Sequence, residues 1–227
     1  MNESRRRIVA WTDAAPEASH AVAWATRHAE ALGLPLRVLR SVAAPVGAAG
    51  AAGYAAPDPA NLEPADVLVT DPDGYRRLGG SVVPVVVVPA RSLGDAGGGR
   101  RVLLLAGSRL SARGADFAFG AAQDLRTALD VVRIAPQDVA FGEDYWIDAA
   151  RSDYRTESRL ELELSRLRAR FPAVPGAFAT LRTRPWATLR SMARSAQLIV
   201  LDRPDAALDP QRVLDLGGCP VVIVAEG

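Results

Sequence analysis

Short apolar runs alternate along the chain with longer segments in which apolar residues recur every three to four positions. The runs at residues 101–106, 129–135, 198–202 and 221–224 are mostly apolar, which is typical of parallel strands buried on both faces of a sheet. Leu160, Leu164, Leu167 and Phe171 form one helical stripe, which Pro172 ends. This alternation predicts an α/β fold with a parallel sheet and right-handed crossovers.

Capping residues predict further elements of the second half. These are a helix from Ser111 to about Leu125, a strand at residues 177–183, a helix at 185–195 that opens with proline, and a last helix between Asp209-Pro210 and Gly217-Gly218. Residues 144–148 and Tyr154 are expected as aromatic surface before the long helix, either for a partner or for the core.

The chain is an internal repeat. An ungapped offset of 93 residues places Trp24-Ala25 on Phe117-Ala118, Leu36 on Leu129, Val38 on Val131 and Arg40 on Arg133. The later strands also match, since residues 67–71 parallel 198–202 and residues 84–88 parallel 220–224. We therefore expect two tandem parallel-sheet α/β domains, residues 1–90 and 101–227, joined by a glycine-containing linker at residues 91–100.

The first domain is a truncated copy. Residues 44–65 stand where the second half has residues 137–197, so 39 residues are missing, enough for one strand and at least one helix. The remaining segment is rich in Ala, Gly and Pro and has no apolar period, and residues 75–82 leave no room for a full helix. One face of this small sheet is then expected to lie bare unless residues 46–64, the second half or another subunit covers it.

Two segments resemble universal stress proteins. The opening Arg-Ile-Val-Ala-Trp-Thr-Asp-Ala-Ala-Pro at residues 7–16, followed by a helix with Trp24-Ala25, resembles the start of that family. The closing Cys-Pro-Val-Val-Ile-Val at residues 219–224 resembles its final strand. The resemblance covers the chain as a tandem pair and implies a Rossmann-like fold with strand order 3-2-1-4-5.

The resemblance also implies how the two halves meet. Members of the family pair their last strands in antiparallel fashion across a dimer. In a tandem chain, residues 85–88 are then expected to pair with residues 221–224 within one molecule, which removes two exposed edges. We expect this intramolecular pseudo-dimer to associate further, as a homodimer, through the thin first half.

A nucleotide site is a further implication of the resemblance. Members that bind ATP use an aspartate after the first strand and a glycine-rich loop ending in Ser or Thr after the fourth. Asp13 matches the aspartate, and Gly79, Gly80 and Ser81 are the nearest match to the end of the loop. Each has a plainer alternative: Asp13 as the N-cap of a helix entered at Pro16, and the glycine segment as a turn before a strand.

The loop itself is missing from both halves. Asp71 and Asp202 follow the fourth strands without the family's glycine spacing. Asp209 stands at the helix start where the family places Ser or Thr, and a carboxylate there accepts the free helix amides and repels a phosphate.

Composition excludes several function classes. The 27 basic and 26 acidic residues give a net charge of +1, which favours neither nucleic acid nor a membrane surface, and every basic residue is arginine, so no lysine is present for a Schiff base or a P-loop. The single cysteine, Cys219, excludes an internal disulfide, and His20 and His28 are expected on a helix surface, too far apart to share a metal. No apolar run is long enough to span a bilayer and no secretory signal is visible, so we expect a cytoplasmic protein.

These features predict a non-catalytic tandem protein of the universal-stress type. Its expected role is stress response or regulation through protein association, without cofactor, metal, nucleic acid or membrane. The alternative is an ATP-binding regulator that uses Asp13, Ser41, Gly79, Gly80 and Ser81.

Overall fold

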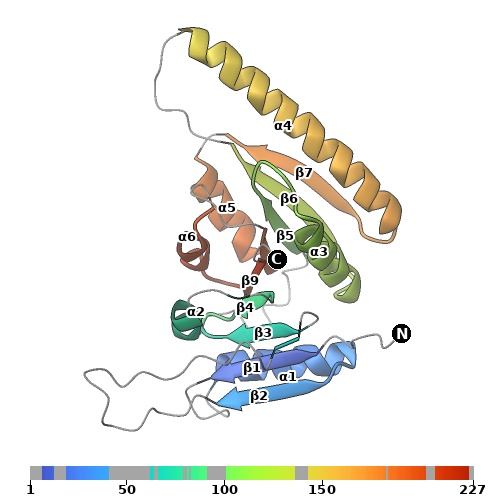
Figure 1. Ribbon diagram of the computed structural model, residues 1–227, viewed down its shortest axis with the longest axis vertical. Helices are drawn as coiled ribbons and strands as arrows, with labels where there is room; N and C mark the ends of the chain where they lie inside the picture. The colour runs from blue at the N-terminus through green and yellow to red at the C-terminus, as the bar shows by residue number, and fades with distance from the viewer. Residues whose placement is uncertain are drawn as a thin grey trace, which may run out of the picture.

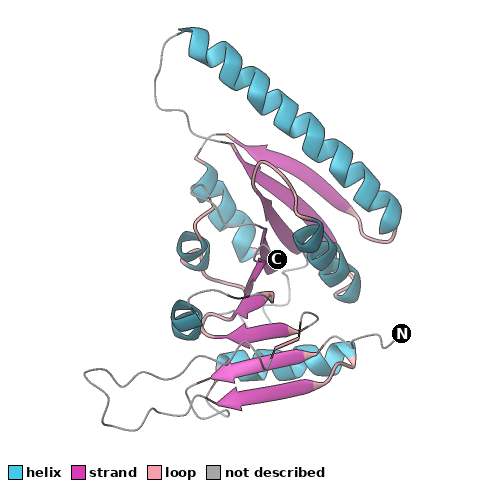
Figure 2. Ribbon diagram, viewed as in Figure 1, coloured by secondary structure: helices cyan, strands magenta, loops and turns pink. Residues whose placement is uncertain are grey.

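The computed structural model describes residues 7–12, 19–40, 62–63, 66–78, 81, 83–90, 101–135, 143–182, 184–202 and 208–224. Within these ranges the strands form one nine-stranded sheet with helices on both faces (Figures 1 and 2). The predicted linker at residues 91–100 lies outside the described residues, so the division into residues 1–90 and 101–227 stays a prediction.

The elements follow one another as strands and helices. The strands are β1 (Ile8–Thr12), β2 (Leu36–Arg40), β3 (Val67–Thr70), β4 (Val85–Val87), β5 (Arg101–Ala106), β6 (Ala128–Ile134), β7 (Gly176–Leu181), β8 (Ala196–Asp202) and β9 (Val221–Val224). The helices are α1 (His20–Leu32), α2 (Pro72–Leu78), α3 (Ala112–Asp124), α4 (Glu143–Arg170), α5 (Pro185–Arg194) and α6 (Pro210–Leu214).

The strand order is β2-β1-β3-β4-β9-β8-β5-β6-β7. The second half, β7-β6-β5-β8-β9, therefore has the expected order 3-2-1-4-5, and the described first half has the same order without a third strand. All neighbouring strands are parallel except β4 and β9, which are antiparallel, with Val85 opposite Ile223 and Val87 opposite Val221. The predicted pairing of the two last strands within one molecule is confirmed.

Two apolar layers cover the sheet, and each contains residues of both halves. Helices α1, α3 and α4 pack on one face, where Val86 and Val222 belong to the same layer. Helices α2, α5 and α6 pack on the other face, around Val85 and Ile223. Because both layers continue across the β4–β9 pair, the two halves share one core.

The face of the first half that was expected to lie bare unless something covers it is covered. Helix α2 begins at Pro72, before the segment in which no room for a helix was expected, and its Tyr75 and Leu78 pack on the second layer. Every residue of β3 and β4 is buried. Leu62, from the segment that was expected as a possible cover, packs on the same layer, and so do residues of the second half. The prediction of no room for a helix was wrong because it left out the residues before Tyr75, where α2 begins. The homodimer predicted from that bare face is not tested.

Two predicted helix starts were also wrong. Helix α1 begins at His20, and its N-cap is Ser19, whose hydroxyl accepts a hydrogen bond from the Val22 amide, so Asp13 is not its cap. Helix α4 begins at Glu143 and contains residues 144–148, which were expected to precede it. Tyr154, on the same helix, is 71% exposed.

The other predicted boundaries agree with the structure. Ser111 caps α3 through the Gly114 amide, and Pro185 opens α5. Gly217 and Gly218, which follow α6, both have positive φ angles, of 65° and 100°, which glycine adopts without strain. None of the helices described is both long and apolar enough to cross a membrane.

Candidate functional site

A buried aspartate closes the start of helix α3 at the carboxyl edge of the second half. Asp202 ends β8, the parallel neighbour of β5, so it lies beside the loop that leads from β5 into α3. Its carboxylate accepts hydrogen bonds from the Ser111 amide at 2.7 Å and from the Ser111 hydroxyl at 2.5 Å. The Ser111 hydroxyl in turn accepts from the Gly114 amide at 2.8 Å. Two donors that a phosphate could use at this helix start, the Ser111 amide and hydroxyl, are therefore bound to the protein's own carboxylate.

Close packing between α3 and β8 leaves no room for a ligand beside the Asp202 carboxylate. A Cβ at Gly114 would collide with the Asp202 carboxylate, so α3 approaches β8 as closely as glycine permits. Asp209 caps α6 in the same manner, accepting a hydrogen bond from the Gln211 amide at 3.1 Å, as predicted. Carboxylates thus accept hydrogen bonds at the starts of both α3 and α6.

At the corresponding edge of the first half, the start of α2 is also bound by a carboxylate. Asp71, after β3, accepts a hydrogen bond from the Gly74 amide at 2.7 Å at the start of α2. The Thr70 hydroxyl is fully buried beneath this turn and has no hydrogen-bond partner. A Cβ at Gly74 would collide with that hydroxyl and would press on the Trp11 ring. Helix α2 therefore packs directly on β3, with no space between them for a ligand.

Most of the predicted nucleotide residues fall outside the described part of the chain: Asp13, Ser41, Gly79 and Gly80. Ser81 is described, and its hydroxyl donates to the Val83 carbonyl at 2.9 Å and accepts from the Val83 amide at 3.1 Å. Ser81 thus makes a local turn before β4. Whether the five residues form a site stays a prediction.

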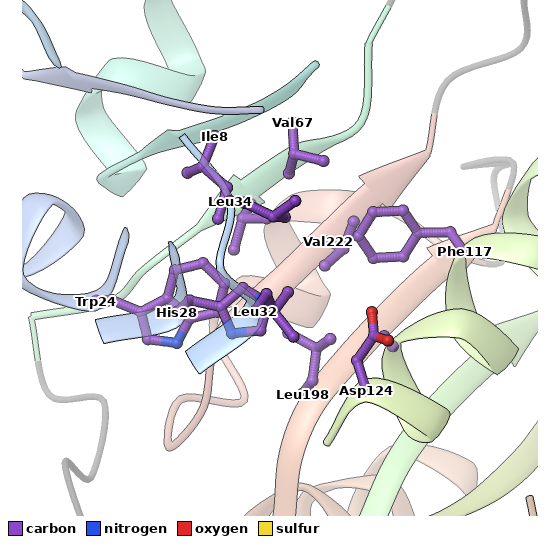
Figure 3. A pocket seen from close by; sticks show the side chains of 12 residues that line it. Ile8, Trp24, His28, Leu32, Leu34, Val67, Phe117, Asp124, Leu198 and Val222 are labelled. Atoms are coloured by element: carbon purple, nitrogen blue, oxygen red, sulfur yellow. The ribbon is translucent and has the colours of Figure 1, made fainter. Parts of the chain in front are cut away.

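An apolar hollow of about 430 Å³, part of it open to solvent, lies where the two halves meet (Figure 3). Val86 of β4 and Val222 of β9 line it at the strand junction. Trp24 of α1 and Phe117 of α3, which are equivalent residues of the repeat, line it from the two helices. The polar members of this lining are His28 and Asp124.

His28 is not the surface residue that we expected, whereas His20 is exposed. The His28 ring stacks on Trp24 with 4.5 Å between the ring centroids. Its pKa lies below the ordinary value because burial disfavours the imidazolium, and the charge of Asp124 opposes this effect only in part. The described residues contain no group of three or more His, Cys, Asp or Glu side chains that could hold a metal ion.

We expect acid to destabilise the protein through His28. Because its folded-state pKa is lowered, the stabilising contribution of neutral His28 is complete above the unfolded pKa of about 6.5 and is lost as the pH falls through the folded pKa. Urea unfolding between about pH 7.5 and pH 5 should therefore show a larger loss of unfolding free energy for the wild type than for His28→Gln. His20→Gln is the control and should behave as the wild type. Equal losses in all three proteins would contradict the assignment.

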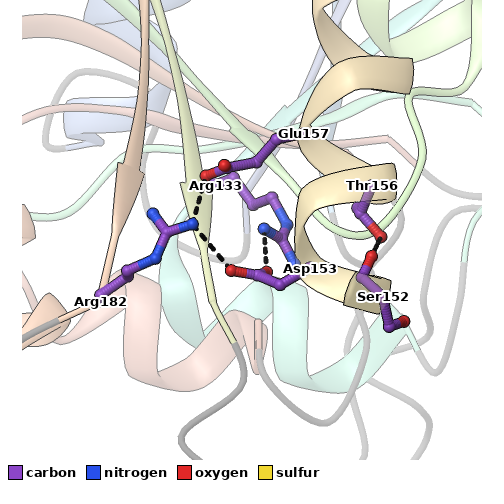
Figure 4. A network of polar contacts seen from close by, with 6 residues as sticks. All are labelled: Arg133, Ser152, Asp153, Thr156, Glu157 and Arg182. Atoms are coloured by element: carbon purple, nitrogen blue, oxygen red, sulfur yellow. Dashed lines mark hydrogen bonds and ion pairs between the residues drawn. The ribbon is translucent and has the colours of Figure 1, made fainter. Parts of the chain in front are cut away.

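A network of ion pairs under α4 was missed by the sequence analysis (Figure 4). Arg133 of β6 is 4% exposed, and its guanidinium lies 2.5 Å from the Asp153 carboxylate. The second Asp153 oxygen lies 2.8 Å from Arg182, which also contacts Glu157 at 2.8 Å. The available signal was an arginine inside an apolar strand, together with two carboxylates one helical turn apart.

Comparison with known proteins finds similar solved structures at low sequence identity. No protein-family model matches it, and no curated protein matches its sequence. It is similar to the crystal structure of a universal stress protein family member from Burkholderia pseudomallei, with 20% identity, a TM-score of 0.41, and 56% of this chain and 97% of that chain covered. A universal stress protein from Lactobacillus plantarum has 15% identity and a TM-score of 0.38, with 56% and 99% covered.

A third structure spans both halves. The cytoplasmic domain of a prokaryotic cation chloride cotransporter has 10% identity and a TM-score of 0.46, with 96% of this chain and 95% of that chain covered. The strand order 3-2-1-4-5 of the second half is the feature that defines the architecture. This order and the antiparallel β4–β9 pair are the arrangement that the resemblance implied, so the fold is of the universal-stress type.

Proposed function

We propose that this protein is non-catalytic and acts in regulation or stress response by binding other proteins, without ATP as cofactor. The observation that carries the proposal is the Asp202 carboxylate, which takes the amide and hydroxyl of Ser111 at the start of α3. An anion brought to this helix start would meet a negative charge and would find the Ser111 amide and hydroxyl already bound.

The first half supports the same proposal. Asp71 caps α2, and Gly74 packs on Thr70 without a gap, so the described start of α2 also presents a carboxylate and has its Gly74 amide bound. Among the described residues, the universal-stress-type fold is thus kept while carboxylates bind at the starts of α2 and α3. The features of such a protein that remain available for function are its surface and its exposed strand edges, through which it can bind another protein.

Calorimetry with ATP tests the proposal. Each charge-assisted hydrogen bond to a phosphate contributes about 1.5–3 kcal/mol, so the loss of two or three weakens a micromolar site to millimolar or beyond. We expect no heat of ATP binding at tens of micromolar protein. Mass spectrometry of small molecules released from freshly purified protein should likewise find no nucleotide.

Asp13→Ala is the diagnostic variant for the alternative. A dissociation constant below about 100 μM for the wild type, lost in Asp13→Ala, would replace the proposal with an ATP-binding regulator that uses the first half.

A further inference from the structure

Strand β2 is an open edge of the sheet. It stands at one end of the strand order, and within the described ranges only β1 pairs with it (Figure 1). Val38, in the middle of this strand, is 39% exposed, although its backbone lies in a regular parallel ladder with β1. An edge of this kind presents a row of N–H and C=O groups to whatever lies beside it.

The internal repeat shows what an occupied edge looks like. Strand β6 is the equivalent of β2, and β7 pairs along its outer side. There the Leu129 amide donates to the Pro175 carbonyl at 2.8 Å, and Val131 is 2% exposed. The residues equivalent to Leu129 and Val131 are Leu36 and Val38, so the outward groups of β2 are those that β6 uses to bind a strand.

The charge of β2 indicates which kind of segment would bind along its edge. In the second half, Arg133 is neutralised by Asp153, which belongs to the helix that covers the strand. Its equivalent in the first half, Arg40, is exposed at the end of β2, and Arg37 is exposed on the opposite face. The strand beside β6 does not supply that carboxylate, since Thr180 lies opposite Arg133. Among the described residues Arg40 lacks the counterpart of α4, so a strand added along β2 would place a side chain beside Arg40, and a carboxylate at that position would form the favourable cross-strand pair.

Two other occupants fit less well. A second copy of β2 would bring four arginines into one junction without an acidic residue, and basic side chains are a common means of preventing edge-to-edge pairing. Residues 41–61 of this chain are mainly Ala, Gly and Pro with a single acidic residue, a composition depleted in strand-forming residues.

Strand β7, at the other end of the sheet, is more covered by neighbouring side chains than β2. Strand β7 has α4 beside it, and the Arg168 side chain donates to the Gly176 carbonyl at 3.3 Å. Arg182, just after β7, is bound to two carboxylates of α4. The comparison favours β2 as the edge at which a partner binds.

We propose that the outer edge of β2 binds an extended segment of another protein as an added strand, with an Asp or Glu of that segment placed against Arg40. This inference rests on the proposed function, because it names the surface and the chemistry through which association occurs. Backbone hydrogen bonds would supply affinity, and the carboxylate would supply specificity.

A random twelve-residue peptide library, displayed on phage and selected on the full chain, tests the proposal. We expect the selected peptides to be enriched in Asp and Glu alternating with β-branched or aromatic residues. The strongest binder, labelled with fluorescein, is then measured by fluorescence anisotropy against the wild type and four variants.

The variants separate backbone pairing from charge. Val38→Pro removes an outward N–H, at an edge position where proline is tolerated, and should weaken binding about five- to tenfold. Val38→Ala keeps that N–H and should weaken binding less than about threefold. Arg40→Glu should weaken binding about tenfold or more, and Arg40→Lys much less. Because the Arg40 side chain is exposed, the Arg40 pair keeps the test informative even if Val38→Pro perturbs the fold.

Hydrogen exchange of the Leu36, Val38 and Arg40 amides gives an independent readout. We expect rapid exchange in the free chain and protection when the selected peptide is bound. Slow exchange in the free chain would overturn the proposal by showing that this chain or a second copy already covers the edge. A smaller mass of Val38→Pro by light scattering would identify the second copy.

Failure of this proposal is distinguishable from failure of the proposed function. Selected peptides that are neutral or basic, or that bind all variants equally, would overturn β2 as the site and leave protein association standing. A library that yields no binder would also overturn the β2 proposal. ATP binding in the calorimeter would instead overturn the proposed function.

Discussion

Replacing Asp153 with alanine is expected to lower the free energy of unfolding by about 3–5 kcal/mol. The reason is Arg133, whose side chain is 5% exposed and has Asp153 as its ion-pair partner. Without that carboxylate, a guanidinium that is always protonated stays buried beneath α4 with its charge uncompensated. Denaturant unfolding followed by circular dichroism measures the change.

Two controls distinguish the buried charge from helix packing. Glu157→Ala removes only the contact with Arg182, which is half-exposed, and should cost less than about 1 kcal/mol. The double variant Arg133→Met/Asp153→Leu removes both buried charges and should recover most of the loss. A double variant as unstable as Asp153→Ala would show that the loss comes from packing of α4 instead.

Asp202→Ala is expected to cost about 3 kcal/mol or more, because two hydrogen bonds to a charged acceptor are lost and the Ser111 amide at the start of α3 loses its partner. Asp202→Asn keeps the shape and one acceptor oxygen and should cost less. Asp209→Ala, at the exposed cap of α6, should cost about 1 kcal/mol. Thermal unfolding of the three variants gives this order.

Anions provide a second readout for Asp202. If the carboxylate stands in for a bound anion, sulfate and phosphate should stabilise Asp202→Ala more than they stabilise the wild type. Equal stabilisation of both proteins would show that the helix start is closed for another reason, such as the tight approach of Gly114.

Local patterns in the sequence predicted the secondary structure well where each segment carried its own signal. Ser111, Pro185 and the two glycines at 217 and 218 act on backbone groups a few residues away, so their effects are visible in sequence. The wrong starts of α1 and α4 arose where the chain offered competing caps or aromatic residues without a stop signal. The β4–β9 pairing was predicted from the resemblance to universal stress proteins, whose last strands pair across a dimer, together with the tandem repeat.

The closed state of the candidate site depended on contacts that no local pattern encodes. Asp202 and Ser111 are 91 residues apart, and Arg133 and Asp153 belong to a strand and a helix separated by residues outside the described part of the chain. In sequence, Asp202 was only a negative charge after a strand. In the structure, the Asp202 carboxylate accepts hydrogen bonds from Ser111 at the start of α3.

The sequence by itself determined the α/β class, the repeat and the truncation, because apolar periodicity and segment length reflect burial at every residue. Only the tertiary structure decided that α2 packs on the first half, that carboxylates bind at the starts of α2 and α3, and that β2 lies at the edge of the described sheet. These outcomes depend on which side chains contact one another across the sheet, and strand register sets those contacts. Burial then makes a paired polar contact favourable and an unpaired polar group costly in free energy.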